Sequence, residues 1–382
     1  MLRLLQEDRL VDPLQKEEFF MHMSDALLSP AVGGVMYAAS AAAIGWSIYK
    51  MKKEDASASG ITDSFDSGFS AAKLPLMAVA GAFVFAAQMI NFTIPGTGSS
   101  GHIGGGILLA GMLGGCPALL TIAAVLIIQC LFFADGGLLA LGANIFNMGV
   151  IPCLIIYPLI FRPVMKWAAR GGSGQKLATG RMTAAAIISA VLGLQLGAFG
   201  VVIETTASGI TALPFSTFVL LMQPIHLAIG IVEGIITAAV FVYVNNSRPE
   251  ILRSAIGAEQ VGAAGQAPVS IRKTVCVLAV LALLVGGGLS LFASAYPDGL
   301  EWSMEKVAGT AELEANDSAH SAAQSIQDKT SILPDYDFAS GSGAVNGTSV
   351  SGVVGAAMTC VLAGAAGGII VFLKRRNGHK RQ

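Results

Sequence analysis

The chain has 382 residues, of which 54% are hydrophobic and only 12% are charged, and its formal net charge is −1. Soluble domains carry about 25% charged residues, so this composition argues against a soluble protein and predicts one embedded in membrane lipid. The near-zero net charge, without a basic and aromatic pattern, excludes nucleic acid from the expected partners. The 46 glycines fit a membrane protein, because small residues let transmembrane helices approach closely.

Residues 1–20 carry many charges and lack the apolar run of about 7–15 residues that a signal peptide needs. They form an extension that is either a short amphipathic surface helix or absent from the mature chain. The next ten residues, MHMSDALLSP, contain His22, one of five histidines in the chain. This segment directly precedes the first long apolar run.

A membrane-spanning helix needs roughly 20 mostly apolar residues. Runs of about this length predict spans at residues 31–49, 74–92, 138–161, 183–203, 218–244, 275–295 and 350–373. The run at 104–133 is too long for one span and too short for two, and its break at Gly114-Gly115-Cys116-Pro117 predicts a short helix followed by a longer one. We therefore predict an all-α integral membrane fold with about seven core helical segments and a C-terminal two-helix module.

Alternating these segments across the membrane collects the basic residues on one side. That side receives Lys50, Lys52, Lys53, Arg162, Lys166, Arg170, Lys176, Arg181, Arg248, Arg253, Arg272, Lys273, Lys374, Arg375, Arg376, Lys380 and Arg381. The other side receives His22, His102, Asp135, Glu204 and the acidic loop after Pro297, with almost no Lys or Arg. Because Lys and Arg concentrate in cytoplasmic loops, this pattern predicts a cytoplasmic C-terminus and an external location for both histidines.

The sequence divides into residues 21–250 as a core, 251–270 as a flexible linker, and 271–382 as a module of two transmembrane helices joined by an external polar loop. The loop is rich in Ala, Ser, Asp and Glu, which predicts that most of it is poorly ordered. Its first residues combine a turn with an interfacial Trp, and this structural reading stands beside a possible role in covering a site. They are Pro297, Asp298, Gly299, Leu300, Glu301 and Trp302.

Polar side chains inside the predicted spans are costly in lipid and tend to be functional. For any one of them alone, an interhelical hydrogen bond is the more common role. The set comprises Gln88, Asn91, Gln129, Asn144, Asn147, Gln195, Gln223, His226 and Glu233.

His22 and His102 are candidate metal ligands, provided that Met21 is the true amino terminus. A histidine second from a free amine offers three nitrogens: the amine, its own deprotonated amide and its ring. The His102 imidazole would fill the fourth position of a square plane, which suits Ni(II) or Cu(II), while imidazole in general also suits Co(II) and Zn(II). The three-nitrogen chelate cannot form with residues 1–20 attached. On composition alone, two loop histidines are more often ordinary loop residues than a ligand pair.

Four segments resemble motifs of the CbiM/NikM family, the substrate-capturing membrane subunits of energy-coupling-factor cobalt and nickel transporters. They are MHMSDALLSP, NFTIPGTGSSGHIGGG, FADGGLLALGANIFNMG and QPIHLAIGIVEG. PDGLEW resembles the PDGLE (NikN-like) domain that is often fused behind this core. The resemblance implies that the mature chain begins at Met21 and that Met21, His22 and His102 hold the metal. It implies supporting positions at Asn91, Asn144, Asn147 and His226. As part of the mechanism, we expect a loop or partner segment to cover the ion, with the region from Asp298 to Trp302 as the candidate.

The resemblance also implies the partners: a transmembrane coupling subunit and cytoplasmic ATPase subunits. The segment from Gly171 to Lys176 misses the spacing of a phosphate-binding loop, so ATP hydrolysis is expected elsewhere and this chain is not expected to be an enzyme. No resident cofactor is expected, since Ni(II) or Co(II) is the transported substrate. The square-planar chelate favours nickel, whereas the family uses the same residue types for cobalt, and the sequence leaves both open.

Two other function classes stay open. An ion-coupled secondary carrier would need intramembrane acids, and Glu233 is the one plausible candidate, without an evident inverted repeat. A membrane metal sensor or assembly scaffold would use His22 and His102 as structural loop residues.

Overall fold

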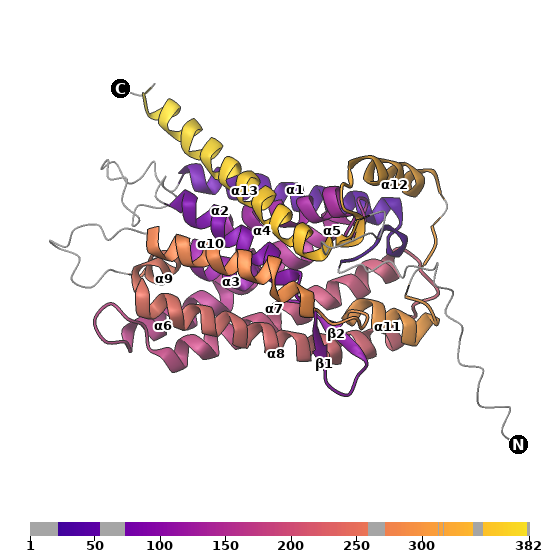
Figure 1. The fold of residues 1–382 in the computed structure, drawn as a ribbon, viewed down its shortest axis with the longest axis horizontal. Helices are drawn as coiled ribbons and strands as arrows, with labels where there is room; N and C mark the ends of the chain where they lie inside the picture. The colour runs from indigo at the N-terminus through magenta and orange to yellow at the C-terminus, as the bar shows by residue number, and fades with distance from the viewer. Residues whose placement is uncertain are drawn as a thin grey trace, which may run out of the picture.

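The computed structural model describes residues 22–53, 73–258, 272–311, 313–315, 317–338 and 347–379. The predicted extension, Met21 and most of the predicted linker therefore lie outside the described residues. Helices along the long axis dominate the molecule (Figure 1).

Six helices among the described residues are long and apolar enough to cross a membrane, and a shorter apolar helix, α2, accompanies them. The six are α1 (Pro30–Lys53), α4 (Gly115–Phe133), the continuous helix Leu141–Arg170, α7 (Thr179–Ala207), α8 (Phe215–Ser247) and residues Gly347–Leu373 of α13 (Gly347–His379). The predicted all-α integral membrane fold is confirmed, and the protein is a multi-pass membrane protein.

The helix Leu141–Arg170 joins three pieces: α5 (Leu141–Ile145), the π-helix η3 (Phe146–Phe161) and α6 (Arg162–Arg170). Pro152 and Pro158 lie inside the π-helical part. Proline supplies no N–H, so the ordinary α-helical ladder cannot continue unbroken through it. The wider π turns occur mostly at functional positions in other proteins.

The core surrounds α2 (Leu74–Gln88), α3 (Gly106–Leu113) and α4, whose side chains are buried on nearly every face. A helix that is apolar all round is expected in such a central place. The predicted break between the short and the long helix is confirmed, because Gly114 ends α3 and precedes α4 with φ +89°, a conformation that favours glycine. α7 packs against α8, and α10 (Arg272–Gly287) and α13 pack against α2.

The span predicted at 74–92 is shorter in the structure. α2 ends at Gln88, and β1 (Phe92–Ile94) pairs with β2 (Ser99–Gly101) in an antiparallel hairpin in which Phe92 faces Gly101. The turn between the strands contains Gly96 and Gly98, both with positive φ. An apolar run alone could not reveal this, because the strands are only three residues each.

The prediction that the external loop is poorly ordered is wrong for most of its length. The loop contains α11 (Gly299–Ala308), α12 (Ser318–Thr330) and the 3₁₀ turn η5 (Pro334–Tyr336). Asp298 and Asp317 cap the two helices with their carboxylates, and apolar side chains such as Leu300 pack on the core. Average composition missed these few anchoring residues. α9 (Pro249–Ile256) is a largely buried helix that occupies the start of the predicted linker.

Figure 1 places the β1–β2 hairpin, α11 and α12 at one end of the bundle, and α6, α9 and the C-terminus at the opposite end.

Candidate metal site

His22 lies just before the 3₁₀ turn η1 (Asp25–Leu27) and is buried, with 4% of its surface exposed. Its Nδ1 lies 2.9 Å from Oδ2 of Asp135, the second residue after α4. Its Nε2 is buried and has no hydrogen-bond partner among the described residues. A buried nitrogen without a partner is costly, and histidines that bind a metal usually have their other ring nitrogen held by a carboxylate, a carbonyl or water, as His22 has here.

Asn144 fixes the main chain next to His22. Its Oδ1 accepts from the N–H of Met23 at 3.2 Å, and its Nδ2 donates to the Met23 carbonyl at 3.1 Å. The same carbonyl accepts from Gly137 N at 3.0 Å. Gly136 has φ +76°, and a Cβ there would lie 2.8 Å from Cβ of His22. The turn after α4 is therefore shaped to the His22 segment.

His102 follows β2 and lies in a glycine-rich loop that side chains of α8 and α2 hold by hydrogen bonds. Both carboxylate oxygens of Glu233, on α8, accept main-chain hydrogen bonds, from Gly104 and Gly105 at 2.9 Å each. The carbonyl of Gly104 accepts from Gln88 Nε2 at 3.0 Å. The loop is thus anchored through its backbone, and the His102 side chain lines the cavity.

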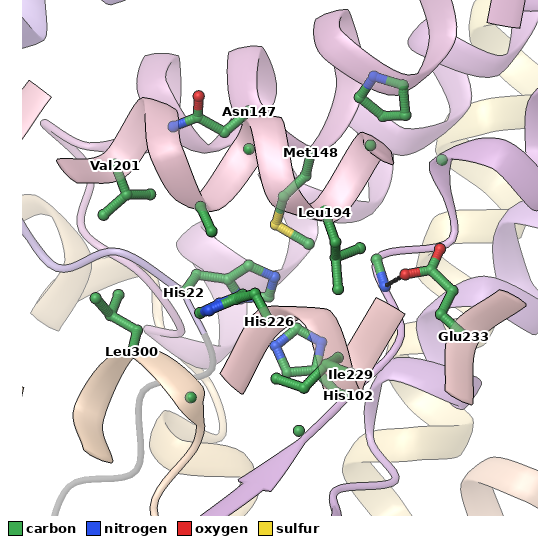
Figure 2. A pocket seen from close by; sticks show the side chains of 18 of the residues that line it. His22, His102, Asn147, Met148, Leu194, Val201, His226, Ile229, Glu233 and Leu300 are labelled. Atoms are coloured by element: carbon green, nitrogen blue, oxygen red, sulfur yellow. Dashed lines mark hydrogen bonds between the residues drawn. The ribbon is translucent and has the colours of Figure 1, made fainter. Parts of the chain in front are cut away.

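The structure brings His22 and His102 together: their ring centroids lie 5.3 Å apart with planes inclined at 55°. His226, on α8, lies beside them, with its Nδ1 2.7 Å from the Met222 carbonyl. In Figure 2 the three imidazoles gather around one space between helices contributed by distant parts of the chain. All three line a cavity of about 110 Å³.

Of the predicted supporting residues, Asn144 and Asn147 also line this cavity. Asn147 donates through Nδ2 to Glu204 at 2.8 Å, and its buried Oδ1 has no partner among the described residues. Asn91 is not among the cavity-lining residues. It lies just after α2, where its carbonyl accepts from Ser294 N at 2.7 Å, so it joins the core to the C-terminal part of the chain.

The region of the predicted cover divides in two. Asp298, Gly299 and Leu300 line the cavity, and a Cβ at Gly299 would lie 3.2 Å from Cε1 of His226. Glu301 instead completes the capping box of α11 with Asp298. Trp302 donates from Nε1 to the Thr97 carbonyl at 3.0 Å. The start of α11 therefore closes the cavity, and its first turn fastens it to the hairpin.

Two buried carboxyls close to the histidines, Asp135 and Asp298, lie outside the long helices. Burial alone would raise the pKa of Asp135, but His22 and the Tyr336 hydroxyl outweigh it and hold the pKa below its ordinary value. Burial raises the pKa of Asp298 despite the N–H groups of Glu301 and Leu300. Asp135 is thus the ionised acceptor beside His22, while ionisation of Asp298 is disfavoured.

Sequence reasoning did not assign roles to Asp135 or Tyr336, and it noted Glu233 without its role as the anchor of the His102 loop. Asp135 is the only polar side chain in the quoted segment FADGG, so the motif itself contained a signal. Within the described ranges, no group of three or more His, Cys, Asp and Glu side chains is arranged to hold a metal by itself. Met21, the other residue predicted to hold the metal, lies outside the described residues.

The chain matches the family model described as cobalt uptake substrate-specific transmembrane region over residues 22–251, and that of the PDGLE domain over residues 272–372. It is 30% identical over 342 residues to a protein of Archaeoglobus fulgidus described as a fused nickel transport protein NikMN, covering 90% of this chain and 96% of that one. It is 32% identical over 241 residues to the fused nickel transport protein NikMN of Rhodobacter capsulatus, covering 61% of this chain and 64% of that one.

A solved structure of a truncated transition metal transporter is 28% identical and aligns with a TM-score of 0.47, covering 59% of this chain and 99% of its own. The resemblance predicted from the four sequence segments is confirmed by the family matches. The first family match spans more than half of the chain. The chain therefore belongs to the cobalt uptake substrate-specific transmembrane family, and it carries a PDGLE domain after that region.

Proposed function

We propose that this protein is the substrate-specific membrane component of an energy-coupling-factor transporter that imports nickel or cobalt ions. The observation that carries the proposal is the buried, unpartnered Nε2 of His22 in the cavity that His102 also lines. The ring separation of 5.3 Å between the two histidines lets one ion lie between them. The names of the relatives support the same substrate class.

The remaining donors belong to the main chain. We propose that Met21 is the mature amino terminus and that its amine and the His22 amide complete a planar set of nitrogens with the two imidazoles. This geometry favours Ni(II). The two hydrogen bonds from Asn144 to Met23 support it, because they fix the backbone that follows the chelate. Asp298 to Leu300 would cover the ion from the C-terminal domain.

The orientation proposal places the site outside and the C-terminus in the cytoplasm. Support comes from the end of the bundle opposite the hairpin, where α6 and α9 lie (Figure 1) and carry Arg170 and Arg253 in their last turns. α1 also ends there, at Lys50, Lys52 and Lys53. Positive residues collect on the cytoplasmic side of membranes. Release inward would then be driven by a transmembrane coupling subunit and separate ATPase subunits.

The test measures uptake of radiolabelled nickel and cobalt in cells that express the chain with or without the coupling and ATPase subunits. The proposal expects uptake only with all partners present, and its loss in His22→Ala and His102→Ala. Uptake that persists without every ATPase partner would instead indicate a secondary carrier. Unchanged uptake in both variants would favour a sensor or scaffold.

The amine ligand has its own test. Amino-terminal sequencing of the metal-loaded protein should begin at Met21. A metal-binding chain that retains residues 1–20 would remove the amine from the donor set and leave the histidine pair to be completed differently.

A further inference from the structure

A segment of the PDGLE domain reaches the side of the metal site that faces away from the cavity. The main-chain N–H groups of Ile332 and Leu333 donate to the carbonyl of Phe132 at 2.9 and 3.3 Å, at the end of α4. Tyr336 follows in the turn η5 and is 6% exposed. Its ring stacks on Phe133, with centroids 5.0 Å apart and planes inclined at 18°.

The hydroxyl of Tyr336 donates to Asp135 Oδ2. This is the same oxygen that lies 2.9 Å from His22 Nδ1. Asp135 is 2% exposed, so protein donors rather than bulk water satisfy this oxygen. A continuous line of hydrogen bonds therefore runs from the PDGLE domain through one carboxylate to the histidine of the site.

The backbone around Tyr336 is unusual. Asp335 and Tyr336 have φ of 52° and 58°, in the left-handed region. Consecutive left-handed residues other than glycine are uncommon, and such conformations persist where the surroundings impose them. Here the imposed turn carries the Tyr336 ring back toward Asp135.

The arrangement fixes one feature of His22. Asp135 Oδ2 lies at hydrogen-bond distance from Nδ1, so this contact occupies one ring nitrogen and leaves Nε2, which has no partner among the described residues, as the nitrogen available to the cavity. A histidine that binds a metal commonly has its other nitrogen held by a carboxylate in this way. The Tyr336 hydroxyl helps to hold that carboxylate in place.

We propose that Tyr336 is a positioning residue for metal capture, acting through Asp135 to hold His22 with Nε2 toward the cavity. The inference rests on the proposed function only in taking His22 as a metal ligand. It assigns the PDGLE domain a specific contact behind the ligand, distinct from the cover that Asp298 to Leu300 form over the cavity.

The experiment titrates the purified full chain with Ni(II) and compares Tyr336→Phe, Asp135→Asn and the double variant. Tyr336→Phe keeps the stacked ring and removes only the hydroxyl. Removing a group that orients a metal ligand typically weakens metal binding 10- to 100-fold, so we expect Asp135→Asn in this range and Tyr336→Phe near its lower end, about 10-fold. The double variant should bind no more weakly than Asp135→Asn alone.

Tyr157→Phe is the matched control, because its hydroxyl donates to the Ala255 carbonyl at the opposite end of the bundle. It should leave nickel affinity unchanged. Tyr336→Phe should also shift the d–d absorption of bound Ni(II), which a loss of distant packing would not do. Should Tyr336→Phe unfold, 4-fluorophenylalanine at that position keeps the ring and fills the space of the hydroxyl without donating, and weaker nickel binding is expected.

Nickel affinity of Tyr336→Phe within twofold of the wild type would overturn the inference. So would an equal further loss in the Asp135→Asn background, since the tyrosine would then act by another route. Unchanged affinity with 4-fluorophenylalanine has the same meaning. A wild-type chain that binds neither nickel nor cobalt refutes the proposed function instead, and the two failures are therefore distinguishable.

Discussion

Glu233→Gln is the sharpest test of how the His102 loop is held. Both carboxylate oxygens of Glu233 accept main-chain N–H groups, from Gly104 and Gly105, at 2.9 Å each. A glutamine has one acceptor oxygen, and its NH₂ group would meet the second N–H as donor against donor. One charge-assisted hydrogen bond is lost and one buried N–H is left without a partner.

A hydrogen bond to a charged group contributes about 1.5–3 kcal/mol. We assume that the whole loss of free energy destabilises the loop conformer that presents His102. The population of that conformer then falls, and the apparent nickel affinity falls by the same factor. At about 1.4 kcal/mol for each factor of ten, the expected loss of nickel affinity is about 10- to 150-fold as an upper bound. The helix itself should persist, because the substitution is isosteric.

The assay is isothermal titration of the detergent-solubilised chain with Ni(II), together with thermal unfolding without metal. Glu305→Gln is the matched control, since Glu305 is an exposed glutamate on α11. Glu233→Gln binding within threefold of the wild type, with Glu305→Gln unchanged, would show that these two hydrogen bonds do not position His102.

Three further predictions follow from the site and its surroundings. Asn144→Ala removes two hydrogen bonds of about 1 kcal/mol each and should weaken nickel binding up to about 30-fold. The control Asn246→Ala, at an exposed position, should leave nickel binding unchanged. Equal nickel affinities of the two variants in titration would contradict the prediction. Gly136→Ala forces a side chain into φ +76° with its Cβ 2.8 Å from Cβ of His22. At about 1–2 kcal/mol for the left-handed conformation alone, this substitution should weaken nickel binding at least about fivefold. Gly96→Ala, with φ +80° and open space, is the control. Burial lowers the pKa of His320, but its hydrogen bonds outweigh burial and raise the pKa above 6.5. Its stabilising contribution is therefore full below pH 6.5 and is lost as pH rises through the higher folded-state pKa. The difference in melting temperature between the wild type and His320→Ala should shrink over that pH range, and a constant difference would refute the prediction.

The pH prediction has a structural basis in α12. His320 Nε2 lies 3.0 Å from the Asp25 carbonyl and 2.9 Å from that of Leu28, while Nδ1 lies 2.6 Å from the Asp317 carboxylate. Only a protonated imidazole can donate at both nitrogens. The protonated ring therefore joins α12 of the PDGLE domain to the segment that follows His22.

The long helices and the break before α4 were predictable because apolar length and glycine placement are local properties. The pairing of His22 with His102 was predictable only through the resemblance, since nothing local links two loops that are eighty residues apart by number. The hairpin Phe92–Gly101 and the order of the external loop were missed because a few caps and anchors decide them, and composition averages over these residues.

The hydrogen bonds that link Tyr336, Asp135 and His22 could not be predicted from the sequence for a different reason. Asp135 and Tyr336 are separated by 201 residues, and neither position shows the periodicity that marks a core face. Asn91 shows that a motif can also predict too many site residues. It belongs to a segment that resembles the family motif, but it does not line the cavity, and its carbonyl instead accepts a hydrogen bond from Ser294.

The core and the PDGLE domain are parts of one polypeptide, with α10 and α13 lying against α2. A tether of this kind makes association intramolecular, at an effective concentration that reaches the millimolar range for short flexible linkers. Dilution into detergent therefore cannot remove Tyr336 from Asp135 in this chain. If the same two parts were expressed as separate polypeptides, nickel affinity should fall as protein concentration decreases, whereas the fused chain should bind nickel equally well at every dilution.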